Sequence, residues 1–371
     1  MGPTPERAAL SDQSLKLITR VASLYYLEHK TQSEIAKELR LSRQKVQRLL
    51  HEARTAGIVE MSIRTLPLLH LDLERQLKSA FSLYDAIVTA SHPDEALQAQ
   101  SVAQAAAGYL ERYLTDSSIV AVSVGRSVGQ IATYLSPEGA HPLFVSALGG
   151  VPHPGKAMSP NDICRALAAT TGGRAEYLYA PAYVESQEVR DLLLSQQAVR
   201  QALECARRAN IAIIGIGGAG DDTLLVRAGC LSVDEVRRAR AQGAVSCVSG
   251  TFLDPNGDEV SPNLQGRLVG LAPDDLRRIP LVIALSAEAG RGPAILSALR
   301  AGIVDVLITT SDNAYDALRA ASAAGVAGSP EDTAHHRAAT PAQPARGPLY
   351  RGTAGDAAPT PRTESESARR L

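Results

Sequence analysis

One segment near the N-terminus carries side chains whose types and spacing suit the reading of DNA bases. It is expected to form a helix over residues 43–55, and its polar outer face and flanks comprise Arg43, Gln44, Lys45, Gln47, Arg48 and His51. An Arg side chain can donate two hydrogen bonds to guanine and a Gln side chain can pair with adenine, whereas Lys suits phosphate oxygens. Apolar residues on the opposite face would pack against a core.

Two capping signals place that helix in a helix-turn-helix. Thr31-Gln-Ser-Glu34 is a capping box that opens a short helix, residues 40–41 make a turn, and Ser42 caps the helix that follows. A preceding helix over residues 14–30 supplies an apolar stripe of Leu17, Ile18, Val21, Leu24, Tyr25 and Leu27. The alternating segment 57–64 is expected to add a wing strand. The candidate DNA-binding residues are therefore Thr31, Ser42, Arg43, Gln44, Lys45, Gln47 and Arg48.

A second group of residues could bind an anion. Gly125-Arg126-Ser127 follows a predicted strand and precedes a predicted helix, so backbone N–H groups, a guanidinium group and a hydroxyl would converge there. Gly149-Gly150 and Gly217-Gly218 also follow predicted strands and could bring the backbone close to a ligand. The alternative is that these glycines only turn the chain.

The segments around these glycines alternate between strand and helix. Strands are expected at 85–89, 118–124, 143–147, 211–216, 244–252, 281–284 and 304–309, and helices at 96–114, 128–135, 160–171, 186–209, 232–242 and 293–301. This alternation predicts an α/β fold with a Rossmann-like parallel sheet, in which ligands bind at the carboxyl ends of the strands.

Charge is divided unevenly along the 371 residues. The chain has 38 basic and 39 acidic residues, but residues 1–64 hold 11 Lys and Arg against 7 Asp and Glu, and the remainder holds 27 against 32. Nucleic-acid binding is therefore expected of the head alone. Its surplus of positive charge is modest, so operator affinity should require two or more heads in a homo-oligomer.

The cysteine pattern and the hydropathy exclude several protein classes. The cysteines form no Cys-x-x-Cys pair and no Cys/His cluster, so neither a metal site nor a cofactor is expected. The sequence contains no signal-like stretch and no apolar run long enough to span a bilayer. The chain is therefore expected to be cytoplasmic.

The head and body together resemble the SorC family of sugar-responsive transcriptional regulators over residues 14–320. The resemblance rests on the motif from Thr31 to Val59, and on Val124-Gly-Arg-Ser127, Ala180-Pro-Ala182, Ile214-Gly-Ile-Gly217 and Ala294–Gly302. Alone, the head would also resemble the promoter-recognition domain of a sigma factor, but a sigma factor needs no α/β body of this size.

The resemblance implies an effector domain with the fold of sugar-phosphate isomerases and deaminases that acts as a receptor. A sugar or polyol, in phosphorylated form, would change the DNA affinity of a repressor or activator, and family members are usually tetramers on palindromic operators. The candidate effector-binding residues are Gly125, Arg126, Ser127, Gly149, Gly150, Gly217, Gly218, Asp254 and Arg291. The alternative is an isomerase- or deaminase-like enzyme fused to a DNA-binding head.

The chain departs from the family pattern in its anion-binding and hydroxyl-binding positions. Where the family has Gly-Gly followed by Lys, this chain has Ala287-Glu288 before Arg291, so Arg291 can replace the cation but Glu288 faces an approaching anion. Cys247 and Thr310 stand where family members often carry Asp, which indicates altered effector specificity. Asp254 matches the family, although the Asp-Pro-Asn-Gly sequence it begins is also an ordinary hairpin turn.

Three regions follow from these observations. Residues 1–64 are expected to form a winged helix-turn-helix, residues 65–322 an effector-binding and oligomerisation domain, and residues 323–371, which have almost no large apolar side chains, a disordered tail. In the linker, Leu69, Leu73 and Leu77 recur at fourfold spacing, which fits either an oligomer seam or a helix docked on the body.

Overall fold

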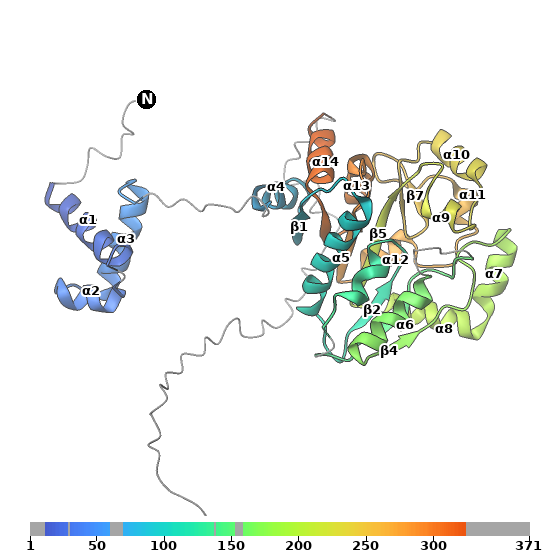
Figure 1. Ribbon diagram of the computed structural model, residues 1–371, viewed down its shortest axis with the longest axis horizontal. Helices are drawn as coiled ribbons and strands as arrows, with labels where there is room; N and C mark the ends of the chain where they lie inside the picture. The colour runs from blue at the N-terminus through green and yellow to red at the C-terminus, as the bar shows by residue number, and fades with distance from the viewer. Residues whose placement is uncertain (1–11, 29, 60–69, 137–138, 153–158, 324–371) are drawn as a thin grey trace, which may run out of the picture. The chain divides into compact units, whose positions relative to one another are not determined.

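Contacts divide the chain into two units, Met1–Leu66 and Pro67–Leu371, and each is described by itself. The computed structural model describes residues 12–28, 30–59, 70–136, 139–152 and 159–323 (Figure 1). The expected tail beyond residue 323, and the expected wing strand beyond residue 59, lie outside these ranges. Within them, no helix combines the length and apolar character needed to cross a bilayer.

In the described part of the N-terminal unit the helices are α1 (Asp12–Tyr26), α2 (Gln32–Glu38) and α3 (Arg43–Thr55). The predicted capping box of α2 is confirmed, since the Thr31 hydroxyl accepts a hydrogen bond from the Glu34 N–H at 3.3 Å and the Glu34 carboxylate accepts one from the Thr31 N–H at 2.8 Å. Ser42 Oγ accepts from the Lys45 N–H at 3.2 Å and begins α3. Between α2 and α3 the chain turns through Arg40, whose φ of 53° is left-handed.

The helices of the head enclose a small core of their own. Its buried side chains are Ile18, Val21, Ala22, Leu24, Ile35, Ala36, Val46, Leu49, Leu50 and Ala53. Leu27, which the sequence placed in the apolar stripe, is 75% exposed, because α1 ends at Tyr26 and the chain turns before the next position on that face is reached.

A parallel sheet forms the centre of the second unit. Its strands are β1 (Asp85–Thr89), β2 (Ile119–Val122), β3 (Leu143–Ser146), β4 (Arg174–Glu176), β5 (Ile211–Gly218), β8 (Leu281–Ser286) and β9 (Val306–Thr310). They lie in the order β1-β9-β8-β5-β2-β3-β4, and each neighbouring pair is parallel. β6 (Ser246–Val248) and β7 (Thr251–Leu253) form an antiparallel hairpin that pairs with the end of β5.

Helices connect and cover these strands. They are α4 (Leu71–Phe81), α5 (Glu95–Glu111), the 3₁₀ helix η2 (Val128–Thr133), α6 (Pro160–Thr171), α7 (Gln187–Ser195), α8 (Gln197–Arg207), α9 (Leu224–Arg227), α10 (Val233–Ala241), α11 (Pro262–Gln265), α12 (Pro273–Arg278), α13 (Gly292–Arg300) and α14 (Ser311–Ala323). The predicted parallel α/β architecture is confirmed.

Three of the sequence predictions about this unit are wrong in detail. The single strand expected at 244–252 is the β6–β7 hairpin, which turns at Ser249 and Gly250 with φ of 47° and 90°. The helix expected at 186–209 divides at Gln196, whose extended backbone separates α7 from α8. The segment expected as an α-helix at 128–135 is the six-residue η2, in which hydrogen bonds join residues three apart, such as Gln130 N–H to the Ser127 carbonyl.

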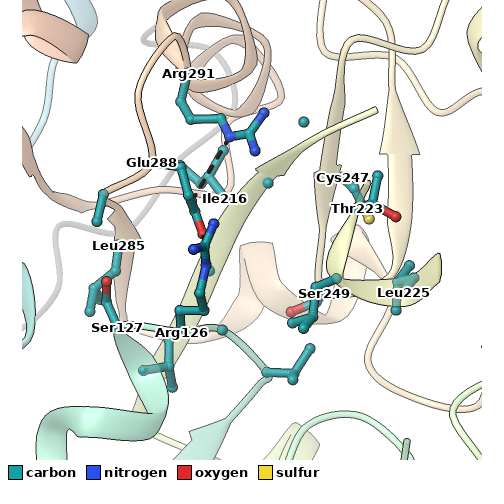
Figure 2. Close-up of a pocket in the computed structure, with 18 of the residues that line it drawn as sticks. Arg126, Ser127, Ile216, Thr223, Leu225, Cys247, Ser249, Leu285, Glu288 and Arg291 are labelled. Carbon is teal, nitrogen blue, oxygen red and sulfur yellow. Dashed lines mark hydrogen bonds and ion pairs between the residues drawn. The ribbon is translucent and has the colours of Figure 1, made fainter. Parts of the chain in front are cut away.

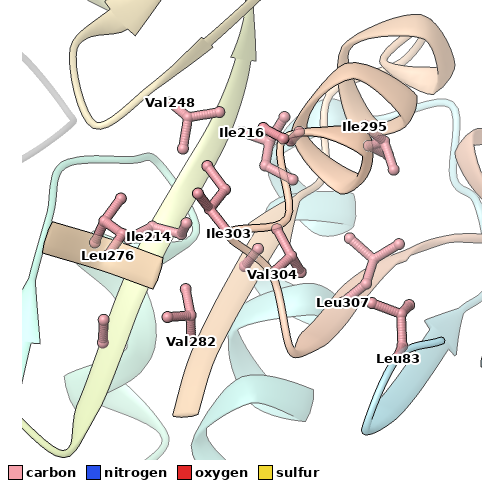
Figure 3. Packing of buried hydrophobic residues seen from close by; sticks show 14 of the residues in the cluster. Leu83, Ile214, Ile216, Val248, Leu276, Val282, Ile295, Ile303, Val304 and Leu307 are labelled. Carbon is pink, nitrogen blue, oxygen red and sulfur yellow. The ribbon is translucent and has the colours of Figure 1, made fainter. Parts of the chain in front are cut away.

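Two hydrophobic layers enclose the sheet. Alternate residues of β8 point to opposite faces: Val282 and Ala284 join the layer that holds α13 and α14, and Ile283 and Leu285 join the layer that holds α5 and α6. Figure 3 shows the first layer, where Val282 and Ile214 lie close to Ile303 and Val304. Burial on both faces explains why these strands read as continuous apolar runs.

Helix α4 belongs to this body. Leu73 and Leu77 are buried in the same layer as α13 and α14, the Glu74 carboxylate accepts a hydrogen bond from the Val88 N–H at 2.9 Å, and Lys78 Nζ lies 3.1 Å from the Asp85 carboxylate. Of the two interpretations of the leucine spacing, the structure therefore has the docked helix; Leu69 lies outside the described residues.

Strand order reverses direction between β2 and β5. From β2 the chain proceeds to β3 and β4 on one side, and from β5 it proceeds to β8 and β9 on the other. The loops that leave β2 and β5 must therefore diverge, which opens a crevice at the carboxyl edge of the sheet.

Candidate functional site

The outer face of α3 presents the polar side chains expected to contact DNA. The exposed residues that we call the recognition face are Arg43, Gln44, Lys45, Gln47 and Arg48. Val46 and Leu49, on the opposite side, are buried in the head's core, so the orientation of the face is fixed. Arg48 Nε lies 3.5 Å from the Glu52 carboxylate, and such an exposed pair is worth only about 0.3–0.5 kcal/mol, so Arg48 can readily exchange it for another acceptor.

Thr31 and Ser42 are both engaged in helix capping. The Thr31 hydroxyl accepts from the Glu34 N–H and also donates to the Glu34 carboxylate at 2.8 Å, so its hydrogen-bonding capacity is largely used within the head. Ser42 uses its oxygen for the Lys45 N–H at the start of α3. Both residues therefore place the helices, and Ser42 stands directly before the recognition face.

An open pocket lies at the crevice between β2 and β5. Its lining comes from the ends of β2, β5 and β8, from the β6–β7 hairpin and from α9: Val124, Gly125, Arg126, Ser127, Val128, Gly215, Ile216, Gly217, Gly218, Thr223, Leu224, Leu225, Arg227, Cys247, Ser249, Gly250, Leu285, Ala287, Glu288 and Arg291. Segments that are far apart in sequence, such as residues 124–128 and 215–218, thus meet at one edge of the sheet.

One wall of the pocket is charged. Arg126, Glu288 and Arg291, which we call the charged wall, lie in a row (Figure 2). Arg126 Nε donates to Glu288 Oε1 at 2.9 Å, and Arg126 Nη1 donates to the Glu95 carboxylate, also at 2.9 Å. Burial alone would lower the pKa of Arg126, but the two carboxylates outweigh it and raise that pKa, so the guanidinium stays charged.

Arg291 is less completely paired than Arg126. Its Nε is buried and has no hydrogen-bond partner within the described structure, and the Glu288 Oε2 atom lies 3.9 Å from it, beyond hydrogen-bond distance. The guanidinium rests over Gly218, where a Cβ atom would overlap Nη1. The glycine at the end of β5 therefore makes room for this cation.

The loop that carries Glu288 and Arg291 is held from behind by Asn313. This fully buried side chain on α14 accepts from the Arg291 N–H at 2.9 Å and donates to the Glu288 carbonyl at 2.9 Å. Both ends of the loop are thus fixed to one amide group, which preorganises the charged wall.

The opposite wall is weakly polar. Thr223, Leu225, Cys247 and Ser249 lie across the pocket from the charged wall (Figure 2). Ser249 Oγ donates to Ser123 Oγ at 2.9 Å, which ties the tip of the hairpin to the end of β2. Desolvation raises the pKa of the Cys247 thiol to about 12, so it is a neutral thiol near pH 7 and a poor nucleophile.

The structure brings six of the nine candidate effector residues together in this pocket. Gly125, Arg126, Ser127, Gly217, Gly218 and Arg291 line it. Since η2 is a short 3₁₀ helix, the Gly125–Ser127 loop does not lead into the α-helix that we expected to attract an anion.

Gly149, Gly150 and Asp254 do not line the pocket. The Gly149 N–H donates to the Val269 carbonyl at 2.9 Å and the Gly150 N–H donates to the Ala180 carbonyl at 2.8 Å, so the amides expected to face a ligand are used within the fold. The Asp254 carboxylate accepts from the N–H groups of Asn256 and Asp258, as the hairpin-turn alternative predicts.

Sequence reasoning missed several lining residues. Arg227 follows no strand and carried no signal, whereas the Ser249-Gly250 dipeptide is a turn signal that could have revealed the hairpin. Of the two positions where the chain departs from family Asp residues, Cys247 lines the pocket and Thr310 does not.

Comparison with known proteins covers both units. Residues 67–319 match the family described as "Putative sugar-binding domain", and residues 20–62 match the helix-turn-helix domain. The erythritol catabolism regulatory protein EryD of Brucella abortus is 29% identical over 305 residues, which are 81% of this chain and 95% of that protein.

Two solved structures are also similar. The sugar-binding domain of a transcriptional repressor from Vibrio fischeri is 32% identical, with a TM-score of 0.63, and the match covers 68% of this chain and 99% of that one. The full-length sorbitol operon regulator SorC of Klebsiella pneumoniae is 26% identical, with a TM-score of 0.63, and covers 83% of this chain and 100% of its own.

Proposed function

Because the chain belongs to the SorC-type family of sugar-binding transcriptional regulators, we propose that an anionic sugar or polyol, a phosphate ester, controls its operator binding from the pocket at β2 and β5. The charge of the lining carries this proposal. Among the described residues that line the pocket, the positively charged side chains are Arg126, Arg227 and Arg291, and the negatively charged one is Glu288. A cleft with a positive surplus favours an anion over a neutral sugar.

Within the pocket, the proposed phosphate ligand is Arg291, assisted by the Ser127 hydroxyl. Arg291 Nε has unused hydrogen-bonding capacity, and a charge-assisted hydrogen bond to a phosphate oxygen of the ester would satisfy it. Ser127 is buried beside the same pocket and its hydroxyl makes no capping hydrogen bond. EryD is a regulator of erythritol catabolism, which supports the inclusion of polyols in the proposed effector class.

In the head, the recognition face is proposed to enter the major groove. Gln44, Gln47 and Arg48 would contact base edges while Arg43 and Lys45 contact phosphates. A single head carries only a modest positive surplus, so we propose a homo-oligomer, a dimer or tetramer, that binds two half-sites at once. As a DNA-binding regulator, the chain is proposed to act in the cytoplasm.

We propose a receptor and not an isomerase. Isomerisation needs a base free to take a proton from carbon. Glu288, the carboxylate in the lining, is bound by Arg126 at 2.9 Å, the Cys247 thiol is neutral, and the lining residues include no histidine. Turnover of a sugar phosphate by the purified full chain would contradict this proposal.

A thermal-shift screen of the full chain tests the assignment of the effector class. Each phosphorylated sugar or polyol is paired with its unphosphorylated form. A phosphate ester present at 100 times its Kd should stabilise the fold by about 2.7 kcal/mol, while its free form has no effect. The same ester should change binding to DNA fragments selected from a random pool by the full chain.

Arg291→Gln should abolish the thermal shift while leaving unliganded DNA binding intact. Arg165→Gln, which alters an exposed arginine on α6 outside the pocket, is the matched control and should respond as the parent chain does. An equal response to free and phosphorylated forms, or a full response from Arg291→Gln, would count against an anionic effector.

A further inference from the structure

The charged wall contains an acceptor as well as cations. Glu288 is the one carboxylate among the described residues that line the pocket. The hydroxyl groups of sugars and polyols donate their strongest hydrogen bonds to ionised carboxylates. The hydroxyls of the lining are weaker acceptors, and one of them, Thr223, already accepts from the Val226 N–H.

Among the residues that the structure describes, only one of the two Glu288 oxygens is strongly bound. Oε1 accepts from Arg126 Nε at 2.9 Å, whereas Oε2 stands 3.9 Å from Arg291 Nε. Oε2 therefore retains acceptor capacity immediately beside the cation that we expect to hold the phosphate.

Arg126 already binds two carboxylates, Glu288 and Glu95. A third anion at this guanidinium would have to break one of these pairs. The arrangement suits a residue that orients Glu288 better than one that binds the effector, in contrast to the direct contact expected from the sequence.

We propose that Glu288 is the residue that sets effector specificity. Its Oε2 accepts a hydrogen bond from the hydroxyl group on the carbon next to the phosphate-bearing carbon, and Arg126 acts as its positioning residue. This inference rests on the proposed function, since it assumes that Arg291 holds the phosphate. The spacing of the two groups favours this hydroxyl, because Arg291 Nε and Glu288 Oε2 are only 3.9 Å apart and groups on neighbouring carbon atoms can reach both at once.

Glu288 also acts against the wrong ligands. An anion without the neighbouring hydroxyl meets the repulsion of the carboxylate and gains no hydrogen bond in return. Inorganic phosphate and deoxy esters should therefore bind poorly, so that the pool of free phosphate does not occupy the pocket.

Calorimetric titration of the full chain with three probes tests this proposal. Glycerol 3-phosphate carries the neighbouring hydroxyl, 3-hydroxypropyl phosphate lacks it, and inorganic phosphate carries neither a carbon atom nor an alcohol hydroxyl. The parent chain should prefer glycerol 3-phosphate to 3-hydroxypropyl phosphate by about 10- to 100-fold, the value of one hydrogen bond to a charged group.

Glu288→Gln and Glu288→Ala should reduce that preference to less than about threefold and should bind inorganic phosphate more tightly than the parent chain does. Glu176→Gln, at an exposed carboxylate outside the pocket, is the control and should change neither value. A preference that persists in both Glu288 variants overturns the proposal.

Arg126→Gln separates positioning from direct binding. If Arg126 orients Glu288, the variant loses the hydroxyl preference and keeps the affinity for inorganic phosphate. If Arg126 holds the phosphate, that affinity falls, and the positioning role is wrong. If the parent chain binds all three probes with the same affinity, the inference alone is refuted. If the parent chain binds none of them, the proposed function on which the inference rests is refuted.

Discussion

The recognition face and the charged wall use arginine in opposite ways. On α3 the cations are exposed, and Arg48 has only a weak partner in Glu52 at 3.5 Å. In the pocket Arg126 is fixed by two carboxylates and Arg291 by the packing over Gly218. A surface that follows a long DNA groove can adapt its side chains on contact, whereas a pocket for a small molecule gains affinity from side chains that are already in place.

The largest effect expected from this contrast is on the head. The double variant Gln44→Ala/Arg48→Ala removes two side chains proposed to contact bases and should weaken specific DNA binding at least about 30-fold, since each such contact is worth about 1–3 kcal/mol. Fluorescence anisotropy with the selected DNA fragment measures this loss.

The thermal response of the double variant to the effector should equal that of the parent chain. Arg165→Ala serves as the control for loss of an exposed arginine elsewhere, and it should bind DNA normally. Unchanged DNA binding by the double variant would show that another surface carries the recognition.

A smaller effect is expected in the pocket from Gly218→Ala. The added methyl group overlaps Arg291 Nη1 and must displace the guanidinium, so effector affinity should fall about tenfold, the value of one charge-assisted hydrogen bond. DNA binding without effector should stay unchanged. Titration of the effector identified by thermal shift provides the measurement.

Gly217→Ala is a matched control for this variant. Its Cβ atom would lie 3.6 Å from the Cys247 carbonyl oxygen, which is an ordinary contact, so affinity should change little. Equal losses at the two neighbouring positions would mean that the β5 backbone, and not the placement of Arg291, determines affinity.

The smallest effect concerns the support beneath the recognition face. Thr31→Ala removes the side-chain cap of α2 and should lower the local stability of the head by about 1 kcal/mol. Native-state hydrogen exchange of the α2 amides in the full chain measures this change. Stability of the sheet domain should not respond, because the two units have separate cores.

Thr19→Ala in α1 is the matched threonine control, and it should be nearly neutral because alanine favours a helix interior.

Acid should weaken the cap that Thr31 and Glu34 form on α2. The backbone and hydroxyl of Thr31 lower the pKa of Glu34, so its stabilisation is present above the ordinary value of 4.5 and is lost as pH falls through the lowered value. Exchange rates in α2 that are insensitive to pH in this range would contradict the role of the capping box.

The contrast also explains what the sequence could reveal. The head was predicted nearly in full because its signals are local: Thr31 and Glu34 are three residues apart, and Ser42 directly precedes the helix it caps. Both ends of α1 were misplaced, because the helix was expected over residues 14–30 and runs from Asp12 to Tyr26, and helix length depends on packing as well as on periodicity.

The pocket was predicted in part because its residues are assembled from distant segments. Parallel strands implied that Gly125, Gly217 and Arg291 would meet at one edge, and they do. Nothing local revealed that the amides of Gly149 and Gly150 bind carbonyl groups elsewhere in the fold. The placement of Arg227 likewise depends on tertiary structure alone.

The buried side-chain amide of Asn313 links the pocket to α14, so binding in the pocket should change hydrogen exchange in that helix. Because Asn313 belongs to α14, the Arg291 amide proton can exchange with solvent only when its hydrogen bond to that helix opens. An effector that holds Arg291 in place should therefore slow exchange along α14, although no described residue of α14 lines the pocket. Helix α14 packs against α4, which is the first described helix of the body and the one nearest in sequence to the head. Binding of the effector should therefore also slow hydrogen exchange of the α4 amides.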